Sequence, residues 1–247
     1  RHYNEFDRYF YEVSRKLSDS LHEVGFSYCP GNVMGQNPTW RKRISEWRSH
    51  ISYIFKKQGP FTVRYITLLF DSAPLFGKRS LFRTYQNHAF DVLSKNRNIL
   101  RQMHEEEEGR HKVPLGIFNT FLTEKDKDHR GEIDMKRSGL LFIIESVRIL
   151  SMKYGIRETS TIKRLQALVQ EGVINREDSE YFENAYRVIL YHTLKAQLGN
   201  FLRKGVHDYH LKPNELSAIN REMLKQAFLV ISRLQDIVGS EFGEPIL

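Results

Sequence analysis

The sequence predicts an α+β fold that is mostly α, with an α/β part over residues 1–108 and a helical bundle over residues 109–247. Apolar side chains recur at three- and four-residue steps along most of the chain, which is the period of an amphipathic helix. Only Ile66 to Leu75 stands out as a strand candidate in the first half. The run Glu105 to Glu108 is typical of a solvated helix end or linker, so we place the domain boundary just after it.

The first half is predicted to contain three helices around the strand candidate. The first covers residues 3–24 and ends at Gly25, which suits a helix C-cap. The second is expected to start at Asn37-Pro38, because Asn is a good N-cap and Pro fits the first helical turn. The third starts near Leu81 and runs without a break into the glutamates, after the strand candidate Ile66 to Leu75.

The pattern of the second half predicts four helices, and four helices of this length are typical of a bundle. Glycine follows the first two as a C-cap, at Gly155 and Gly172, and the pair Asn175 and Asp178 marks the start of the third. The apolar faces run from Leu140 to Val147, Ile162 to Val169, Tyr181 to Ala196 and Ile219 to Val238. Gly239-Ser240 is expected to be a frayed end past the last helix.

Composition indicates a soluble globular protein, with 40% hydrophobic and 28% charged residues. The chain has no apolar run of about 18 residues and its first residues do not resemble a signal peptide, so we expect a cytoplasmic protein without membrane contact. Cys29 is the single cysteine, which excludes an internal disulfide and a cysteine-built metal site.

The net charge of +8 is concentrated in one stretch of the chain. Residues 36–101 hold thirteen Lys and Arg against three acids, Glu46, Asp71 and Asp91. A triphosphate, a nucleic acid or an acidic protein would each suit this field. Nucleic acid is the least favoured of the three, because the charge does not form a clustered stripe with exposed aromatic residues.

Two segments carry a resemblance to a known family. They are CPGNVMGQNPTWRKRISEW, from Cys29 to Trp47, and EIDMKRSGLLFIIESVRIL, from Glu132 to Leu150. They resemble bacterial putative nucleotidyltransferases that are similar to the PII-protein uridylyltransferase. Members of that family usually follow cyclic-nucleotide-binding and CBS sensor domains, and they end in a helical substrate-binding domain. The resemblance covers nearly the whole chain and extends through Leu69-Phe70-Asp71, where an acid ends a strand in the family.

The resemblance implies transfer of a nucleoside monophosphate from an NTP to a protein or small-molecule hydroxyl, with Mg²⁺ as the cofactor of the intact enzyme. The Gly-Ser turn and Asp-x-Asp strand that perform this chemistry lie upstream of the first helix in the family. We therefore expect this chain to be a fragment that is inactive alone. Asp126-Lys127-Asp128 has the right spacing, but it lies in a polar segment and is better explained as a surface loop.

Asp71 is the one acid in a basic and apolar surround, which makes it a weak candidate for a catalytic or metal-binding carboxylate. The preferred interpretation is an ion pair with Arg41, Arg64 or Arg79. No other metal ligand is assigned.

Seven residues of the helical domain are implied by the resemblance to bind nucleotide or substrate. They are Lys136, Arg137, Gly139, Arg148, Thr161, Arg164 and Gln197. Lys136 and Arg137 stand at a predicted helix N-terminus, where free amides and the positive dipole end favour a phosphate. Arg148, Arg164 and Gln197 either line one cleft or hydrogen-bond between helices of the bundle.

The alternative function is a non-catalytic regulatory or interaction module, in which the chain docks an acidic protein or the upstream CBS or cyclic-nucleotide sensor domains. The sequence encoded upstream of Arg1 would discriminate between the two functions. A Gly-Ser turn followed by an apolar Asp-x-Asp strand favours the enzyme. Which nucleotide or acceptor is used, and whether the chain forms a homodimer, stay open.

Overall fold

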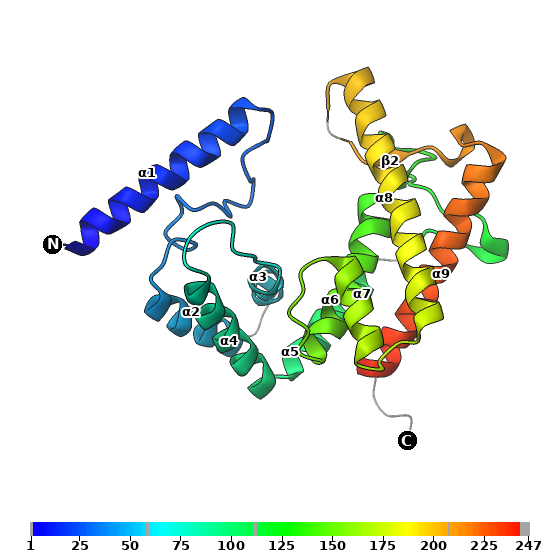
Figure 1. The fold of residues 1–247 in the computed structure, drawn as a ribbon. Helices are drawn as coiled ribbons and strands as arrows, with labels where there is room; N and C mark the ends of the chain where they lie inside the picture. The colour runs from blue at the N-terminus through cyan, green and yellow to red at the C-terminus, as the bar shows by residue number, and fades with distance from the viewer. Residues whose placement is uncertain (1, 58–59, 111–112, 207, 243–247) are drawn as a thin grey trace. The chain divides into compact units, whose positions relative to one another are not determined.

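The computed structural model describes residues 2–57, 60–110, 113–206 and 208–242. Over these residues the fold is mostly helical with one small two-stranded sheet, as Figure 1 shows, which confirms the predicted α+β, mostly α class. The chain divides into two compact units. The first contains Arg1–Lys57 and Pro74–Val92, and the second contains Gln58–Ala73 and Leu93–Leu247. The boundary placed after residue 108 on sequence grounds stays a prediction.

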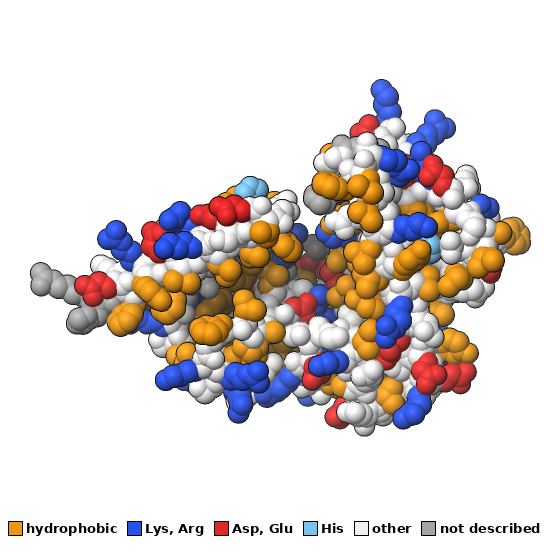
Figure 2. Space-filling view, turned by 45° about the horizontal axis from the view of Figure 1, so that its top comes forward, with side chains coloured by type: hydrophobic (Ala, Val, Ile, Leu, Met, Phe, Trp, Pro, Cys, Tyr) orange, Lys and Arg blue, Asp and Glu red, His pale blue; other side chains and the backbone are white. Residues whose placement is uncertain are grey.

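The first unit contains α1 (His2–Glu23), α2 (Ile44–Lys56) and most of α4 (Arg79–Lys95). The first predicted helix is confirmed by α1, and Gly25 follows it with φ of +102°. The apolar face of α1 is exposed: Phe6 is 62% exposed and Leu17 is 50% exposed. In Figure 2 charged side chains lie along the opposite edge of this helix. The helix is thus amphipathic with its apolar side uncovered.

The helix start expected at Asn37-Pro38 is wrong, because α2 begins at Ile44. The Asn37 side chain instead accepts a hydrogen bond from the Thr39 amide at 2.9 Å and closes a local turn. Arg41 then holds the turn, since its guanidinium donates to the carbonyls of Gly35 and Gln36 and pairs with Asp7 of α1 at 2.8 Å. Side-chain bonds to the backbone have replaced the first helical turn.

The strand expected over Ile66 to Leu75 is also wrong. Its first five residues lie in α3 (Pro60–Phe70), the rest form a turn and irregular chain, and no described residue before β1 is in a strand. The buried residues Val63, Ile66, Leu69 and Phe70 are spaced at three, three and one residues, which is a helical face. A short apolar run does not distinguish a strand from a buried helix, and this run forms a buried helix.

The uninterrupted helix expected from Leu81 to the glutamates is broken at Asn96-Arg97. It forms α4 and a separate α5 (Asn98–Arg110). The Asn96 amide bonds the Leu93 carbonyl at 3.0 Å, which is a tight turn rather than a continued helix. The glutamate run lies in the last turns of α5.

The bundle of the second unit is confirmed by four further helices, α6 (Leu141–Lys153), α7 (Thr161–Gln170), α8 (Arg176–Lys204) and α9 (Ala218–Phe242). The predicted start of α8 is correct, since the Asn175 side chain accepts from the Asp178 amide at 2.7 Å. Gly155 and Gly172 end α6 and α7 with φ of +71° and +70°. Gly239-Ser240 is not a frayed end but lies inside α9, and none of the described helices is long and apolar enough to cross a membrane.

A small antiparallel sheet was not expected from the sequence. It joins β1 (Ile133–Asp134) to β2 (His210–Leu211), with Ile133 opposite Leu211 and Asp134 opposite His210. A π-helical turn, Lys136–Leu140, leads from β1 into α6. Short 3₁₀ turns cover Ile117–Asn119 and Pro213–Glu215. The sheet fixes the start of α6 beside the segment that follows α8.

The ends of α6 and α9 are joined by an ion pair that should make stability depend on pH. Lys153 Nζ lies 2.7 Å from Glu241 Oε2, and the Tyr154 hydroxyl donates to the same oxygen at 2.8 Å. Burial raises the pKa of the Glu241 carboxyl, but the hydrogen bonds from Lys153 and Tyr154 outweigh this and lower it.

We therefore expect Glu241→Gln to lower the melting temperature slightly at neutral pH, by an energy of about 0.5–1 kcal/mol. Because the folded pKa lies below the unfolded one, this contribution is present above the ordinary glutamate pKa and is lost as the pH falls through the folded value. Thermal melts of both proteins from pH 7 to pH 3 should converge at the acidic end. A difference that is constant over this range would contradict the assignment.

Candidate functional site

Asp71 follows the last residue of α3 and is the centre of a charged cluster in the second unit. Its amide completes the helix by bonding the Thr67 carbonyl at 3.1 Å. A carboxylate at a helix C-terminus is unfavourable against the helix dipole, so it needs cationic neighbours. Two arginines from distant helices supply them. Arg148 of α6 pairs with Oδ2 of Asp71, and Arg164 of α7 pairs with Oδ1 at 2.8 Å.

Both arginines are more deeply buried than the carboxylate that they share. The side chains of Arg148 and Arg164 are 8% and 2% exposed, whereas that of Asp71 is 29% exposed. Arg164 also donates through Nε to the Glu158 carbonyl at 2.6 Å and through Nη2 to the Phe70 carbonyl at 3.3 Å. The second bond satisfies a carbonyl at the C-terminus of α3, where helical partners are lacking.

The cluster retains donors that the described chain does not satisfy. Arg148 Nε and Arg164 NH1 are buried without a hydrogen-bond partner. Burial lowers the pKa of the Arg164 guanidinium, and Asp71 opposes this shift. Glu145 adds a second carboxylate, 3.9 Å from Arg148 NH1. Two buried guanidiniums thus face two carboxylates, with donor capacity left over.

The expected partners of Asp71 were wrong, because the carboxylate pairs with Arg148 and Arg164 rather than with Arg41, Arg64 or Arg79. The carboxylate also ends a helix and not a strand. Its two oxygens each face a guanidinium, and two cations at this distance oppose a divalent metal ion. The surroundings of Asp71 therefore do not fit Mg²⁺, and we derive no catalytic step from this residue.

The π-helical turn places Lys136 and Arg137 at the start of α6, as expected, but its amides are not free. Asp134 Oδ1 accepts from the backbone amides of both residues at 3.0 Å. The anion that the helix N-terminus favours is thus a carboxylate of the chain itself. Both side chains are exposed. Lys136 Nζ lies 4.7 Å from the centre of the Tyr209 ring, and Arg137 Nε lies 3.6 Å from Asp134 Oδ2.

Gly139 lies in the same turn and allows it to pack closely against α8 and α9. A Cβ atom at this position would lie 2.9 Å from Ile189 Cγ2 of α8 and 3.2 Å from Phe228 Cε1 of α9. Glycine lets the turn approach both helices closely. The structure therefore places Gly139 against the core.

A groove of about 480 Å³ opens beside the π-helical turn. Its volume is within the usual range of roughly 300–1,000 Å³ for ligand pockets. Two arginines, Arg64 of α3 and Arg137, and two carboxylates, Glu107 of α5 and Glu145 of α6, lie in its wall. Glu145 connects the groove to the buried cluster through Arg148. The remaining lining residues are Val63, Thr67, Leu68 and Leu141.

The seven residues implied by the resemblance are thus only partly brought together. Arg148 and Arg164 share Asp71, and Arg137 lines the adjoining groove. Thr161 is buried one turn before Arg164 on α7. Gln197 is half-buried on α8 and does not line this groove. Arg64 and Glu145 were missed, although an exposed arginine between buried positions of α3 was a usable signal.

Comparison with protein families identifies the class of protein. The family described as "Putative nucleotidyltransferase substrate binding domain" matches residues 97–242, and the one described as "Putative nucleotidyltransferase" matches residues 2–60. The chain belongs to the family described as "Putative nucleotidyltransferase substrate binding domain", and the matched residues lie in its larger unit. Comparison with curated proteins and with solved structures gives no match.

Proposed function

We propose that this chain is the substrate-binding part of a nucleotidyltransferase that moves a nucleoside monophosphate from an NTP to a protein or small-molecule hydroxyl, as the PII-protein uridylyltransferase does. In this proposal the groove beside the start of α6 holds an anionic substrate, either the nucleotide or an acidic acceptor. The described residues bind and orient this substrate. The transfer itself needs the Gly-Ser turn and the Asp-x-Asp carboxylates of the family.

The observation that carries the proposal is the continuity of the groove with the buried arginine cluster. Arg64 and Arg137 are exposed at the groove, and the Glu145 carboxylate in its wall lies 3.9 Å from Arg148. Arginine is suited to phosphate because its planar guanidinium donates two parallel hydrogen bonds. An entering phosphate would compete with Asp134 for Arg137 and with Glu145 for Arg148. Binding would then affect the ion pairs of Asp71, which connect α3, α6 and α7.

Mg²⁺ enters the proposal as a partner of the NTP. When bound with the NTP, it would supply positive charge against the phosphates. No described residue is assigned to hold it, because Asp71 is occupied by two arginines. Arg64 and Arg137 would bind the remaining phosphate charge, and Thr67 is a further polar residue of the groove lining.

We expect millimolar magnesium-nucleotide to raise the melting temperature of the protein, and Arg137→Gln to reduce that rise by at least half. A hydrogen bond to a charged group contributes about 1.5–3 kcal/mol, so losing it weakens binding roughly tenfold or more. Differential scanning fluorimetry with ATP, UTP and CTP measures the shift.

Arg187→Gln is the matched control. Arg187 is also exposed and also forms a long ion pair within its helix, 3.7 Å from Glu183, but it lies on α8 outside the groove. An unchanged melting curve of the original chain at millimolar nucleotide, or an equal loss in both variants, would reject nucleotide binding in the groove. Transfer of labelled nucleotide should then be assayed in a form that includes the residues encoded upstream of Arg1.

One surface favours the alternative, a regulatory module that docks a protein such as an upstream CBS or cyclic-nucleotide sensor domain. Apolar residues of α8 recur on one face and are largely exposed: Leu194 is 54%, Leu198 is 59% and Leu202 is 74% exposed. Exposed apolar stripes of this kind often mark protein contacts. Nucleotide that leaves the melting temperature unchanged, together with loss of a sensor-domain complex in Leu198→Glu, would favour this alternative.

A further inference from the structure

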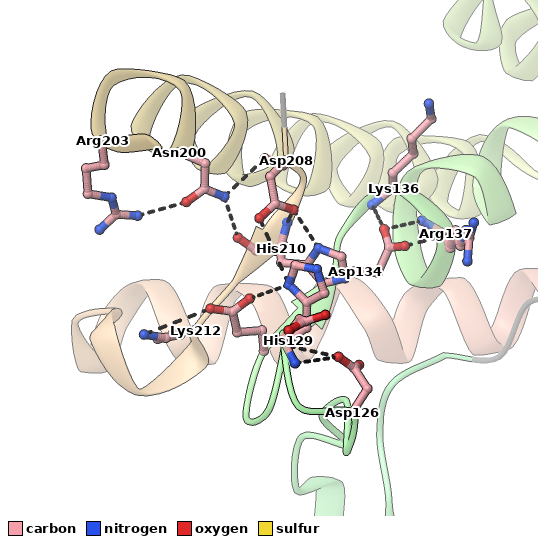
Figure 3. A network of polar contacts seen from close by, with 12 residues as sticks. Asp126, His129, Asp134, Lys136, Arg137, Asn200, Arg203, Asp208, His210 and Lys212 are labelled. Atoms are coloured by element: carbon pink, nitrogen blue, oxygen red, sulfur yellow. Dashed lines mark hydrogen bonds and ion pairs between the residues drawn. The ribbon is translucent and has the colours of Figure 1, made fainter. Parts of the chain in front are cut away.

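A cluster of two histidines and two carboxylates lies where β1 meets β2, and none of its four residues lines the groove. It consists of His129, Glu132, Asp208 and His210, and one nitrogen or oxygen atom from each lies within 4.8 Å of the others. Figure 3 shows the two imidazole rings one over the other, with the Asp208 carboxylate beside them. Glu132 is buried and the other three are half-buried.

The local chain geometry explains why these residues meet. Glu132 directly precedes β1, and Asp208 lies two residues before His210, the first residue of β2. The Asp208 carboxylate accepts from the His210 amide at 3.0 Å, which holds it beside the His210 ring. The antiparallel pairing brings the two segments together. His129 belongs to the turn before β1, where Asp126 Oδ1 accepts from its amide at 2.9 Å. The strand pairing and these local turns together bring the four residues to one place.

Each imidazole faces a carboxylate. His129 Nδ1 lies 2.9 Å from Glu132 Oε2, and His210 Nδ1 lies 2.6 Å from Asp208 Oδ1. The second Asp208 oxygen is 4.0 Å from His129 Nδ1, so this carboxylate reaches both rings. The rings are stacked with centroids 3.5 Å apart and planes at 11°. The Glu132 carboxylate also raises the pKa of His129.

A second layer of contacts holds the cluster. The Asn200 amide of α8 is 4% exposed and donates to the carbonyls of Asp208 and His210 at 3.1 and 3.0 Å. Arg203 fixes the orientation of this amide by donating to its oxygen at 3.0 Å. Lys212 Nζ is 3.9 Å from Glu132 Oε1, a contact that Figure 3 draws as a dashed line. Such outer contacts are typical of metal sites.

We propose that His129, Glu132, Asp208 and His210 form a four-ligand site for Zn²⁺. Two imidazole nitrogens and two carboxylate oxygens match the ligands that Zn²⁺ accepts in tetrahedral sites, whereas Mg²⁺ prefers oxygen alone. With neutral histidines the ligands carry two negative charges, which balance the ion. Four protein ligands make a closed site, which is typical of a structural metal.

Binding requires a small rearrangement. A metal ion bonds an imidazole in the plane of its ring, so the stacked rings of His129 and His210 have to tilt apart. The ion then takes the place of the proton between His129 and Glu132. Its effect is to fasten β2 to β1 and to the turn before it. This inference goes beyond the proposed function, because it needs no nucleotide.

The test is calorimetric titration of the untagged, chelator-treated protein with ZnCl₂. We expect one equivalent to bind and the melting temperature to rise, with MgCl₂ producing neither effect. His210→Gln and Glu132→Gln should each weaken binding at least about tenfold. Asp126→Asn is the matched control, since Asp126 is a neighbouring carboxylate that bonds only backbone amides in the cluster, and an asparagine oxygen can replace it.

Co²⁺ provides a measurement on the unmodified chain, in case a variant does not fold. It should show the visible absorption band of a four-coordinate ion, and ZnCl₂ should remove that band. The proposal is overturned if the original protein binds no Zn²⁺ at micromolar concentration, if Co²⁺ stays six-coordinate, or if both variants, with normal circular dichroism, bind Zn²⁺ unchanged.

Discussion

Replacing Asp71 by asparagine should lower the free energy of unfolding by about 3 kcal/mol, which corresponds to a fall in melting temperature on the order of 10 °C. This destabilisation has two causes, the lost attraction between Asp71 and its arginines and the charges that are left unpaired. Arg148 and Arg164 are nearly inaccessible, and without the carboxylate their two positive charges stay close together in a poorly solvated place. Urea unfolding followed by circular dichroism measures the effect.

A matched control shows whether the loss of stability comes from burial of the ion pair or from removal of any carboxylate charge. Glu183→Gln removes one partner of a 3.7 Å ion pair whose arginine, Arg187, is 62% exposed and therefore stays solvated, and it should cost less than about 0.5 kcal/mol. In a double-mutant cycle, Arg148→Met should recover part of the loss in Asp71→Asn, because it removes one of the two unpaired charges. Equal effects of Asp71→Asn and Glu183→Gln would show that the buried cluster does not contribute to stability.

Gly139→Ala should lower the free energy of unfolding by about 1–3 kcal/mol, although alanine is the better helix former. The added methyl group would approach Ile189 Cγ2 to 2.9 Å, and Ile189 is fully buried, so the π-helical turn or α8 has to move. Chemical denaturation measures the change.

Gly239→Ala is the corresponding control within α9. A Cβ atom there meets no atom within 4 Å, so this variant should be more stable by about 0.5–1 kcal/mol. Opposite signs for the two substitutions would confirm that the close approach of Gly139 to α8 is the cause. Combining Gly139→Ala with Ile189→Ala should cost less than the sum of the separate changes. Stabilisation by Gly139→Ala would contradict the packing explanation.

Three helices of the bundle, α6, α7 and α8, could be predicted because each has a clear local signal at one end. Asn175 caps α8, and Gly155 and Gly172 take the left-handed conformation after α6 and α7. The errors in the first half arose where a local signal had two meanings. Asn37 begins a turn as readily as a helix, and the apolar run after Ile66 suits a buried helix as well as a strand.

The candidate site was only half predictable for a different reason. Asp71 is the one acid in an apolar stretch, and a buried charge requires an opposite one, so the sequence indicated that Asp71 has a basic partner. Which arginine meets Asp71 depends on tertiary packing, since more than 70 residues separate them. The histidine and carboxylate cluster was missed because strands of two residues, such as β1, leave almost no periodic pattern.

The interleaving of the two units along the chain has a consequence for dissection of the protein. Residues 58–73 are grouped with the second unit, although stretches of the first unit precede and follow them. A truncated chain that starts at residue 109 would lose α3 and α5, and Asp71 with them. Arg148 and Arg164 would then be left without their counter-ion, so such a fragment should express as an unstable or aggregating polypeptide, whereas a fragment that begins at residue 58 should keep the pair intact.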